Sequence, residues 1–144
     1  MIRQANQEDA FVVAQLAVQM WPSHTVEDLN EEFESLLGQT DAAVFLCQAQ
    51  GKFVGFAQCQ LRNDYVEGTE TSPVGYLEGI FVTEEHRKQG NAMQLLAACE
   101  QWAKERGCIE FASDCELDNT QSLAFHLRCG FREANRIICF AKEL

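Results

Sequence analysis

One stretch, residues 76–98, constrains the fold of this chain more than any other. An apolar segment, a short charged loop and a segment with helical periodicity follow one another there without interruption. Residues 77–82 have the length and composition of a buried strand, with Glu78 as the one charge inside it. From Ala92 onward, apolar residues recur at the spacing of one helix face. We therefore predict a strand, a tight loop and an amphipathic helix in direct succession.

The loop at residues 87–92, with the sequence RKQGNA, has the composition of an anion-binding turn. Small residues at Gly90 and Ala92 let a ligand approach the backbone closely. The first amides of the next helix lack partners within the helix, so they suit a phosphate or pyrophosphate. Arg87 and Lys88 add positive charge where the helix dipole alone favours negative residues. The six residues by themselves also fit an ordinary loop, but the flanking strand and helix favour anion binding.

The composition indicates one globular domain over residues 1–144, because a hydrophobic content of 47% suffices for a sizeable core. No apolar run approaches the ~20 residues of a membrane span, and no leader-like segment opens the chain. We therefore expect a cytoplasmic protein without membrane association. The formal net charge of −11 argues against a nucleic-acid partner, which requires basic patches. That charge is compatible with a cationic substrate and equally with an acidic surface that serves solubility.

The seven cysteines form no Cys-x-x-Cys pair and no metal-ligand spacing. Most lie in apolar or alternating stretches, where a free cysteine behaves as a small core residue. An odd and scattered set is typical of a reducing compartment. We therefore predict structural cysteines and no metal site.

Periodicity and turn residues along the rest of the chain predict a mixed α/β fold with one sheet covered by helices. The predicted order is strand, two helices, three strands, helix, strand, helix, strand. Residues 43–49 and 53–61 are predicted to form a hairpin, and the closing strands are predicted at Phe131 and at residues 137–141. The second helix has an acidic side, which is a solvated face by default and otherwise a field that attracts a polycation.

Two predicted strands carry carboxylates beside the anion-binding loop: Glu78 lies inside one, and Asp114 ends the other. Gly79 indicates a bulge or a close approach of the backbone next to Glu78. Carboxylates in such a place can bind a substrate ammonium group and pass its proton to water. The alternative is a structural acid bonded to neighbouring amides, and we favour the functional role for both residues.

Several features resemble, in order and spacing, the GNAT family of acetyl-CoA-dependent N-acetyltransferases, and the resemblance covers the whole chain. They are Val82, Arg87-x-x-Gly90-x-Ala92, Asp118-Asn119 and residues 125–131, FHLRCGF. Within that family the chain is most similar to the short aminoglycoside N-acetyltransferases that modify the 6′-amino group. This closer similarity lies in a motif Leu-x-x-x-Met-Trp-Pro-x-His ending at His24 and in residues 64–68, 71–75, 77–82, 112–114 and 118–119. The resemblance implies a single GNAT-like domain with a central mixed, mostly antiparallel sheet flanked by about four helices.

The resemblance also implies two half-sites that share one strand. The pantetheine arm of acetyl-CoA would pair with the backbone of Ile80, Phe81 and Val82. The rest of the cofactor would contact Arg87, Lys88, Gln89, Gly90, Asn91, Ala92, Met93 and Asn119. The aminoglycoside would contact Trp21, His24, Tyr65, Glu78 and Asp114. Trp21, Tyr65 and Asn119 also have structural alternatives, as a helix staple, a loop anchor and a helix cap, and His24 is the least determined.

Two positions depart from the family pattern. His126 stands where many members carry a tyrosine that protonates the leaving thiolate. A histidine can supply that proton, or it can be a residue of the helix surface. Asn135 stands where the related aminoglycoside enzymes tend to carry an acidic residue near the C-terminus, so the resemblance does not assign the outer contacts of the acceptor.

We therefore expect an enzyme that transfers an acetyl group from acetyl-CoA to a primary amine by direct attack in a ternary complex. Glu78 or Asp114 would remove the amine proton through water. The expected acceptor is the 6′-amino group of an aminoglycoside. The alternatives are another cationic amine, such as a polyamine or peptide, and a module that binds acetyl-CoA without turnover. We also expect a homodimer, with its interface at the last strands.

Overall fold

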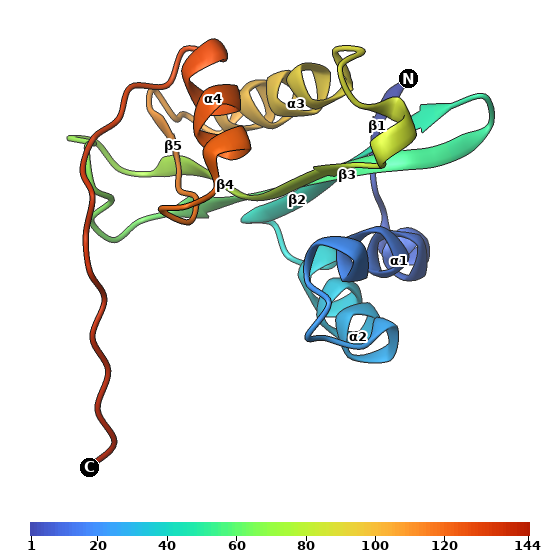
Figure 1. Ribbon diagram of the computed structural model, residues 1–144, viewed down its shortest axis with the longest axis horizontal. Helices are drawn as coiled ribbons and strands as arrows, with labels where there is room; N and C mark the ends of the chain where they lie inside the picture. Colours follow the sequence, from blue (N-terminus) through green and yellow to red (C-terminus); the bar gives the residue numbers. More distant parts are fainter.

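The computed structural model describes residues 1–144 and has three layers, with one five-stranded sheet between two pairs of helices (Figure 1). The strands are β1 (Ile2–Gln4), β2 (Ala42–Ala49), β3 (Lys52–Arg62), β4 (Val74–Val82) and β5 (Phe111–Ser113). The helices are α1 (Ala10–Met20), α2 (Val26–Leu37), α3 (Asn91–Glu105) and α4 (Thr120–Arg128), with short 3-10 helices at Gln7–Asp9 and Glu84–His86. Helices α1 and α2 cover one face of the sheet, and α3 and α4 cover the other. The predicted fold class is confirmed.

The strands of the sheet follow the order β1-β2-β3-β4-β5. The first three pairings are antiparallel, and only β4 and β5 run parallel. That parallel pairing is short, because it joins only Gly75, Tyr76 and Leu77 of β4 to β5. Beyond this point β4 continues to Val82 with no strand beside it on that edge. The mixed, mostly antiparallel sheet expected from the sequence therefore has a gap beside residues 78–82.

A β-bulge interrupts β4 at Glu78. Gln58 of β3 is opposite Gly79 while Cys59 is opposite Leu77, so Glu78 has no partner on β3. Leu77 packs into the core below α3, whereas Glu78 lines a cavity on the α1–α2 face and an added Cβ at Gly79 would also point to that face. Bulges re-aim side chains in this way and are frequent beside active sites. The bulge that Gly79 indicated is confirmed.

Two apolar cores lie on opposite faces of the sheet. The α1–α2 core includes Val13, Leu29, Phe33, Leu46 and Phe56. The α3 core includes Cys47, Cys59, Leu95, Cys99 and Trp102. Cys108 is also buried, so four of the predicted core cysteines are confirmed, whereas Cys115 and Cys139 are exposed. No helix has both the length and the apolar composition that a bilayer crossing requires.

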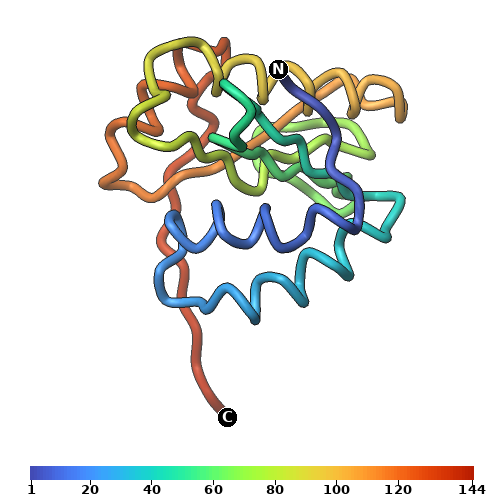
Figure 2. Tube along the Cα trace, turned by 90° about the vertical axis from the view of Figure 1, so that its right-hand side faces the viewer, coloured from blue at the N-terminus to red at the C-terminus, as the bar shows by residue number.

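The predicted closing strands at Phe131 and residues 137–141 are absent. The chain beyond α4 forms no helix or strand and extends away from the body (Figures 1 and 2). Its first part is held by bonds from Arg132 to the Gly68 carbonyl at 2.8 Å and from Asn135 to Glu67 at 3.2 Å. A strand needs a neighbouring edge, and this anchoring leaves residues 137–141 without one inside the protomer. The prediction of these strands was wrong for the isolated chain.

Candidate active site

The N-terminus of α3 presents backbone amides that nothing in the chain accepts. The first hydrogen bond of this helix runs from the Gln94 amide to the Gly90 carbonyl at 3.1 Å. The amides of residues 90–93 therefore have no acceptor within the helix. Gly90 has a left-handed backbone with φ of 84°, and an added Cβ would meet no atom within 4 Å. No side chain caps α3, whereas Thr25 caps α2. The open donors at the positive end of a helix suit a pyrophosphate.

The loop before α3 is fixed by its own side chains. Arg87 donates from Nε to the Val82 carbonyl at 2.8 Å, and Asn91 donates from Nδ2 to the His86 carbonyl at 3.0 Å. The two terminal nitrogens of the Arg87 guanidinium remain without a partner. Lys88 is exposed and also has a left-handed backbone, with φ of 61°. The loop therefore presents two cationic groups beside a preformed turn.

The open edge of β4 leads directly to this loop. Residues 78–82, which include the predicted Ile80, Phe81 and Val82, have backbone groups that face no strand on the β5 side. An extended pantetheine arm can pair with such an edge as an added strand does. The predicted Asn91, Ala92 and Met93 form the first turn of α3, and Gln89 lies in the loop just before its N-cap Gly90. The uncapped amides and the open edge therefore fit the two chemically distinct parts of acetyl-CoA.

Asn119 lies at the N-terminus of α4, where its Oδ1 accepts a hydrogen bond from the Ser122 amide at 3.1 Å. The cap considered as an alternative is therefore formed by the side-chain oxygen. The Nδ2 group makes no bond in the chain and remains able to donate. Capping and cofactor contact are thus compatible at this residue.

A cavity of about 300 Å³ lies on the α1–α2 side of the Glu78 bulge. It is lined by Trp21, His24, Leu29, Glu32, Phe33, Leu36, Gln58 and Glu78. Trp21 follows α1, and an added Cβ at Gly79 would lie 3.1 Å from its indole, so the glycine lets the ring lie against β4. Three predicted acceptor residues, Trp21, His24 and Glu78, therefore line one cavity.

Glu32 and Gln58 belong to the same cavity but were not predicted as site residues. Glu32 lies on the acidic side of α2, and that run of acids was the one sequence signal for it. Gln58 carried no signal, because it sits in an alternating strand like any outward-facing polar residue. A cavity with Glu32 and Glu78 on its wall and Trp21 beside them can bind an amine with an attached sugar ring.

Glu78 also belongs to a cluster with Arg62, Tyr76 and Asp114. Arg62 Nη2 donates to both carboxylate oxygens of Glu78, at 2.9 Å to Oε2, and its Cζ lies 3.5 Å from the centre of the Tyr76 ring. The Tyr76 hydroxyl donates to Asp114 Oδ2. Burial and this hydrogen bond raise the pKa of Tyr76 far above its usual value, so it stays a protonated donor. Sequence reasoning missed Arg62 and Tyr76, which connect the two predicted acids.

Tyr65 is not brought into the acceptor cavity. Its side chain is 77% exposed and lines a separate hollow formed by the loop at residues 63–72. The hydroxyl lies 3.5 Å from Glu67 Oε2, within the same loop. In this protomer Tyr65 is therefore an exposed aromatic residue at a distance from the Trp21 cavity.

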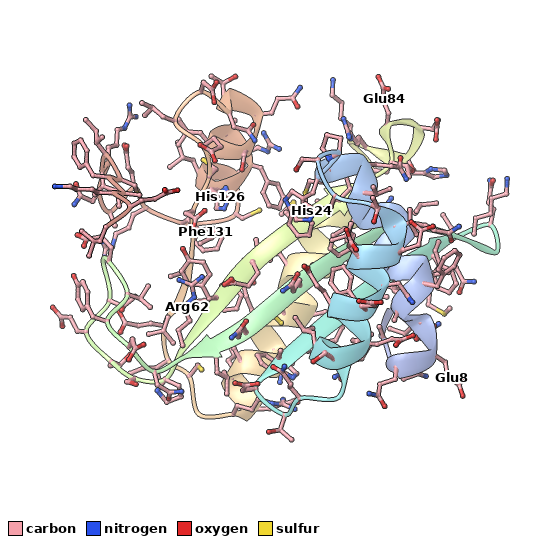
Figure 3. All side chains as sticks on the ribbon, turned by 90° about the horizontal axis from the view of Figure 1, so that it is seen from below. Glu8, His24, Arg62, Glu84, His126 and Phe131 are labelled. Atoms are coloured by element: carbon pink, nitrogen blue, oxygen red, sulfur yellow. The ribbon has the colours of Figure 1, made fainter.

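His126 bridges α4 and the end of β5 and is not a residue of the open helix surface. Its Nδ1 lies 2.7 Å from the Ser122 carbonyl, and its Nε2 lies 2.8 Å from Ser113 Oγ. Because a carbonyl only accepts, Nδ1 carries a proton. Figure 3 shows His126 beside Phe131, with ring centres 5.1 Å apart, while Arg62 lies at the end of β3. Ser113 was not predicted. No group of three or more His, Cys, Asp or Glu side chains is placed to hold a metal ion.

Comparison with known proteins places this geometry in a family. Residues 7–131 match the model of the acetyltransferase (GNAT) family. The chain is 44% identical over 144 residues to aminoglycoside N(6')-acetyltransferase type 1 of Stenotrophomonas maltophilia, covering 99% of this chain and 93% of that protein. It is 40% identical over 137 residues to the enzyme of the same name from Serratia marcescens, covering 94% and 92%.

Two solved structures superpose over the full length of the chain. AAC(6')-Iy in complex with the bisubstrate analog CoA-S-monomethyl-acetylneamine has a TM-score of 0.95 at 39% identity, covering 100% of this chain and 98% of that one. AAC(6')-IG from Acinetobacter haemolyticus has a TM-score of 0.90 at 35% identity, covering 100% and 99%. With the family match over residues 7–131, these similarities show that the chain belongs to the GNAT family of acetyltransferases.

Proposed function

We propose that this protein transfers the acetyl group of acetyl-CoA to the 6′-amino group of an aminoglycoside. The relatives from S. maltophilia and S. marcescens carry the name of this activity, and AAC(6')-Iy binds a CoA-containing bisubstrate analog. The observation that carries the proposal is the bulge at Glu78. It places one carboxylate where the acceptor cavity meets the open edge of β4. A primary amine held at Glu78 lies next to the strand edge that suits the acetyl donor.

On the donor side, the open edge at Ile80, Phe81 and Val82 holds the pantetheine arm by backbone hydrogen bonds. The amides at residues 90–93, with Arg87 and Lys88, hold the pyrophosphate, and Asn119 Nδ2 donates from α4. Acetyl-CoA supplies an activated acetyl thioester. A free amide of the open edge near Ile80 can polarise the thioester carbonyl.

On the acceptor side, Trp21 packs against a sugar ring while Glu32 and Glu78 bind ammonium groups. His24 borders the same cavity. The amine must be neutral to attack, so Glu78 takes its proton, through a water molecule where the distance requires one. Asp114 adds negative charge through the Tyr76 hydroxyl. Tyr65 contacts only the outer part of a larger acceptor, because its loop lies apart from the Trp21 cavity.

The leaving thiolate takes its proton from His126 by way of Ser113. In the imidazolium form both ring nitrogens donate, one to the Ser122 carbonyl and one to Ser113 Oγ. The Ser113 hydroxyl is then free to pass its own proton to the sulfur and to receive another from Nε2. If this is one path, Ser113→Ala and His126→Asn lower kcat by the same factor, and the double variant loses no more. Additive losses in kcat would show that Ser113 and His126 act independently, and would overturn this path of proton transfer.

We further propose that the domain of residues 1–144 acts as a homodimer through its C-terminal tail. Ile137, Ile138 and Phe140 are between 72% and 91% exposed, which is unfavourable for side chains of this kind in an isolated chain. Exchange of such a segment between two copies gives it a sheet edge to pair with. A chain truncated after residue 136 would then be monomeric in sedimentation experiments, and the full chain dimeric. A full-length monomer would exclude this interface.

We place the reaction in the cytoplasm. All seven cysteines are free, and four of them are buried in the core, which suits a reducing compartment.

Thiol release from acetyl-CoA with a panel of amines tests the proposed activity. The panel contains a kanamycin-type aminoglycoside, its 6′-hydroxy analogue, a polyamine and a basic peptide. We expect turnover with the 6′-amino compound and none with the 6′-hydroxy analogue. Equal rates with both would overturn the site of acetylation. Faster turnover of the polyamine or peptide would identify another cationic amine as the substrate, and acetyl-CoA binding without any turnover would identify a binding module.

A further inference from the structure

The cluster beside the acceptor cavity contains a cation that the proposed reaction does not use. Arg62 donates from Nη2 to both oxygens of Glu78, and its guanidinium lies 3.5 Å from the centre of the Tyr76 ring. A carboxylate and an aromatic face are the two groups by which proteins recognise a substrate ammonium. Arg62 therefore occupies, within the chain itself, the binding position that a cationic acceptor requires.

We propose that Arg62 is an internal competitor of the acceptor amine, which binds Glu78 only after displacing the guanidinium. This inference rests on the proposed function, because it takes the amine at Glu78 to be that of the acceptor. Each cationic acceptor exchanges one cation for another at Glu78, so it gains less affinity there than it would at a free carboxylate. Arg62 is thus a residue that sets acceptor affinity and leaves the acetyl donor unaffected.

The structure allows the guanidinium to leave. The side chain of Arg62 is 42% exposed, compared with 17% for Glu78. Arg62 is the last residue of β3, and the chain continues from it into the loop at residues 63–72. Its guanidinium makes no hydrogen bond other than those to Glu78. Rotation of one long side chain toward solvent therefore exposes both Glu78 and the face of Tyr76 without disturbing the core.

Arg62 also gives Glu78 a counter-ion before the substrate arrives. Glu78 is a partly buried carboxylate, and a charge in such a place requires a counter-ion. Arg62 supplies it in the free enzyme, and the acceptor ammonium supplies it in the complex. A neutral group at the same position of the acceptor provides no replacement, so it leaves Arg62 in place.

The test measures acceptor binding by isothermal titration calorimetry for the wild type, Arg62→Gln, Arg62→Lys and the control Arg3→Gln. The control removes the same charge from Arg3, which lies on β1 at the opposite edge of the sheet and is paired with Asp9. For a kanamycin-type 6′-amino aminoglycoside, we expect Arg62→Gln to lower Kd about two- to fivefold, the scale of a partly exposed ion pair. Arg62→Lys and Arg3→Gln should keep the Kd of the wild type.

Two further readouts separate competition from a structural role. The 6′-hydroxy analogue should bind Arg62→Gln and the wild type equally, because it does not displace the guanidinium. In steady-state assays KM for the aminoglycoside should fall in Arg62→Gln, with kcat and KM for acetyl-CoA unchanged. Weaker 6′-amino binding or a lower kcat in Arg62→Gln would show that Arg62 positions Glu78 instead, and would overturn the proposal.

A second experiment uses the wild type and does not depend on the folding of Arg62→Gln. A crystal structure of the wild type with the 6′-amino aminoglycoside should show the guanidinium beyond hydrogen-bonding distance of Glu78. An intact Arg62–Glu78 pair in that complex would overturn the inference. A wild type that turns over no aminoglycoside would instead overturn the proposed function, so the two failures are distinct.

Discussion

The two sides of β4 are built in different ways. On the α3 side, the surface that suits acetyl-CoA consists largely of backbone: the open edge at residues 78–82 and the uncapped amides at residues 90–93. On the α1–α2 side, the proposed acceptor cavity consists of side chains contributed by α2, β3, β4 and the linker between α1 and α2. A backbone surface depends on chain conformation, whereas a side-chain cavity depends on residue identity. Substitutions on the two sides should therefore affect different kinetic constants.

Glu78 lies where the open edge of β4 meets the side-chain cavity, and its replacement should have the largest effect on turnover. Glu78→Gln keeps the size of the side chain but removes the proposed base, so kcat should fall about 10²- to 10³-fold. KM for acetyl-CoA should stay within about twofold of the wild type, because the contacts proposed for the donor near Glu78 are made by the backbone. Steady-state thiol release with each substrate varied in turn measures both constants. Glu32→Gln is the matched control in the same cavity and should raise only KM for the acceptor. A normal kcat in Glu78→Gln would exclude its role as the base.

Gly90→Ala tests the backbone side. A left-handed conformation costs a residue with a side chain roughly 1–2 kcal/mol, so the loop should shift and KM for acetyl-CoA should rise about tenfold. KM for the acceptor should not change. Gly107→Ala is the matched control, because Gly107 also has a left-handed backbone, with φ of 87°, and lies just beyond the other end of α3. Equal effects of both variants on KM would mean that the change reflects general destabilisation.

Gly79→Ala, a change in β4 beside Glu78, tests the side-chain cavity next to Trp21. The added Cβ would lie 3.1 Å from two atoms of the Trp21 ring, which is closer than normal contact, so the indole must move. KM for the acceptor should rise about three- to tenfold, while KM for acetyl-CoA should stay unchanged. Phenylalanine lacks the two indole atoms in question, so adding Trp21→Phe should restore part of the space. Crystallography of Gly79→Ala would show an unmoved indole if the explanation is wrong.

The smallest effect is expected for the arginine–carboxylate pair outside the site. Arg3 donates to both oxygens of Asp9 at 2.8 Å, and this bond holds the pKa of Asp9 below its usual value. A lowered pKa in the folded state gives stability that is present above the unfolded value of about 4 and is lost as the pH falls through the folded value. Arg3→Gln should therefore lower the free energy of unfolding by about 0.5–1 kcal/mol at pH 7.

Urea denaturation at pH 7 and near pH 3 measures this difference, which should shrink at the lower pH. Acetylation should be unaffected, in contrast to the effect on acceptor binding expected at Arg62. A pH-independent difference would show that Arg3 acts through packing on Phe53, which its guanidinium also contacts.

The donor side could be predicted from the sequence because its parts are contiguous. A strand, a loop with Gly90 and a helix start follow one another within residues 76–98, and local rules of chain conformation are sufficient to place them. Gly79 beside Glu78 likewise indicated the bulge, since the two residues are neighbours in the chain. The fold class followed from periodicity and from the resemblance to the family.

The acceptor side and the end of the chain depended on tertiary structure. By sequence, Gln58 is an ordinary strand residue and Arg62 is the first residue of a polar loop after the predicted strand, and their proximity to Glu78 appears only where β3 lies against β4. Tyr65 had the right chemistry, but its loop places it elsewhere. Residues 137–141 have the composition of a strand, yet a strand forms only where a neighbouring edge is free to pair with it. The sequence by itself determined the local backbone that suits the acetyl donor, whereas the acceptor site was decided by the packing of distant segments, because pairing between strands and between side chains is not encoded locally.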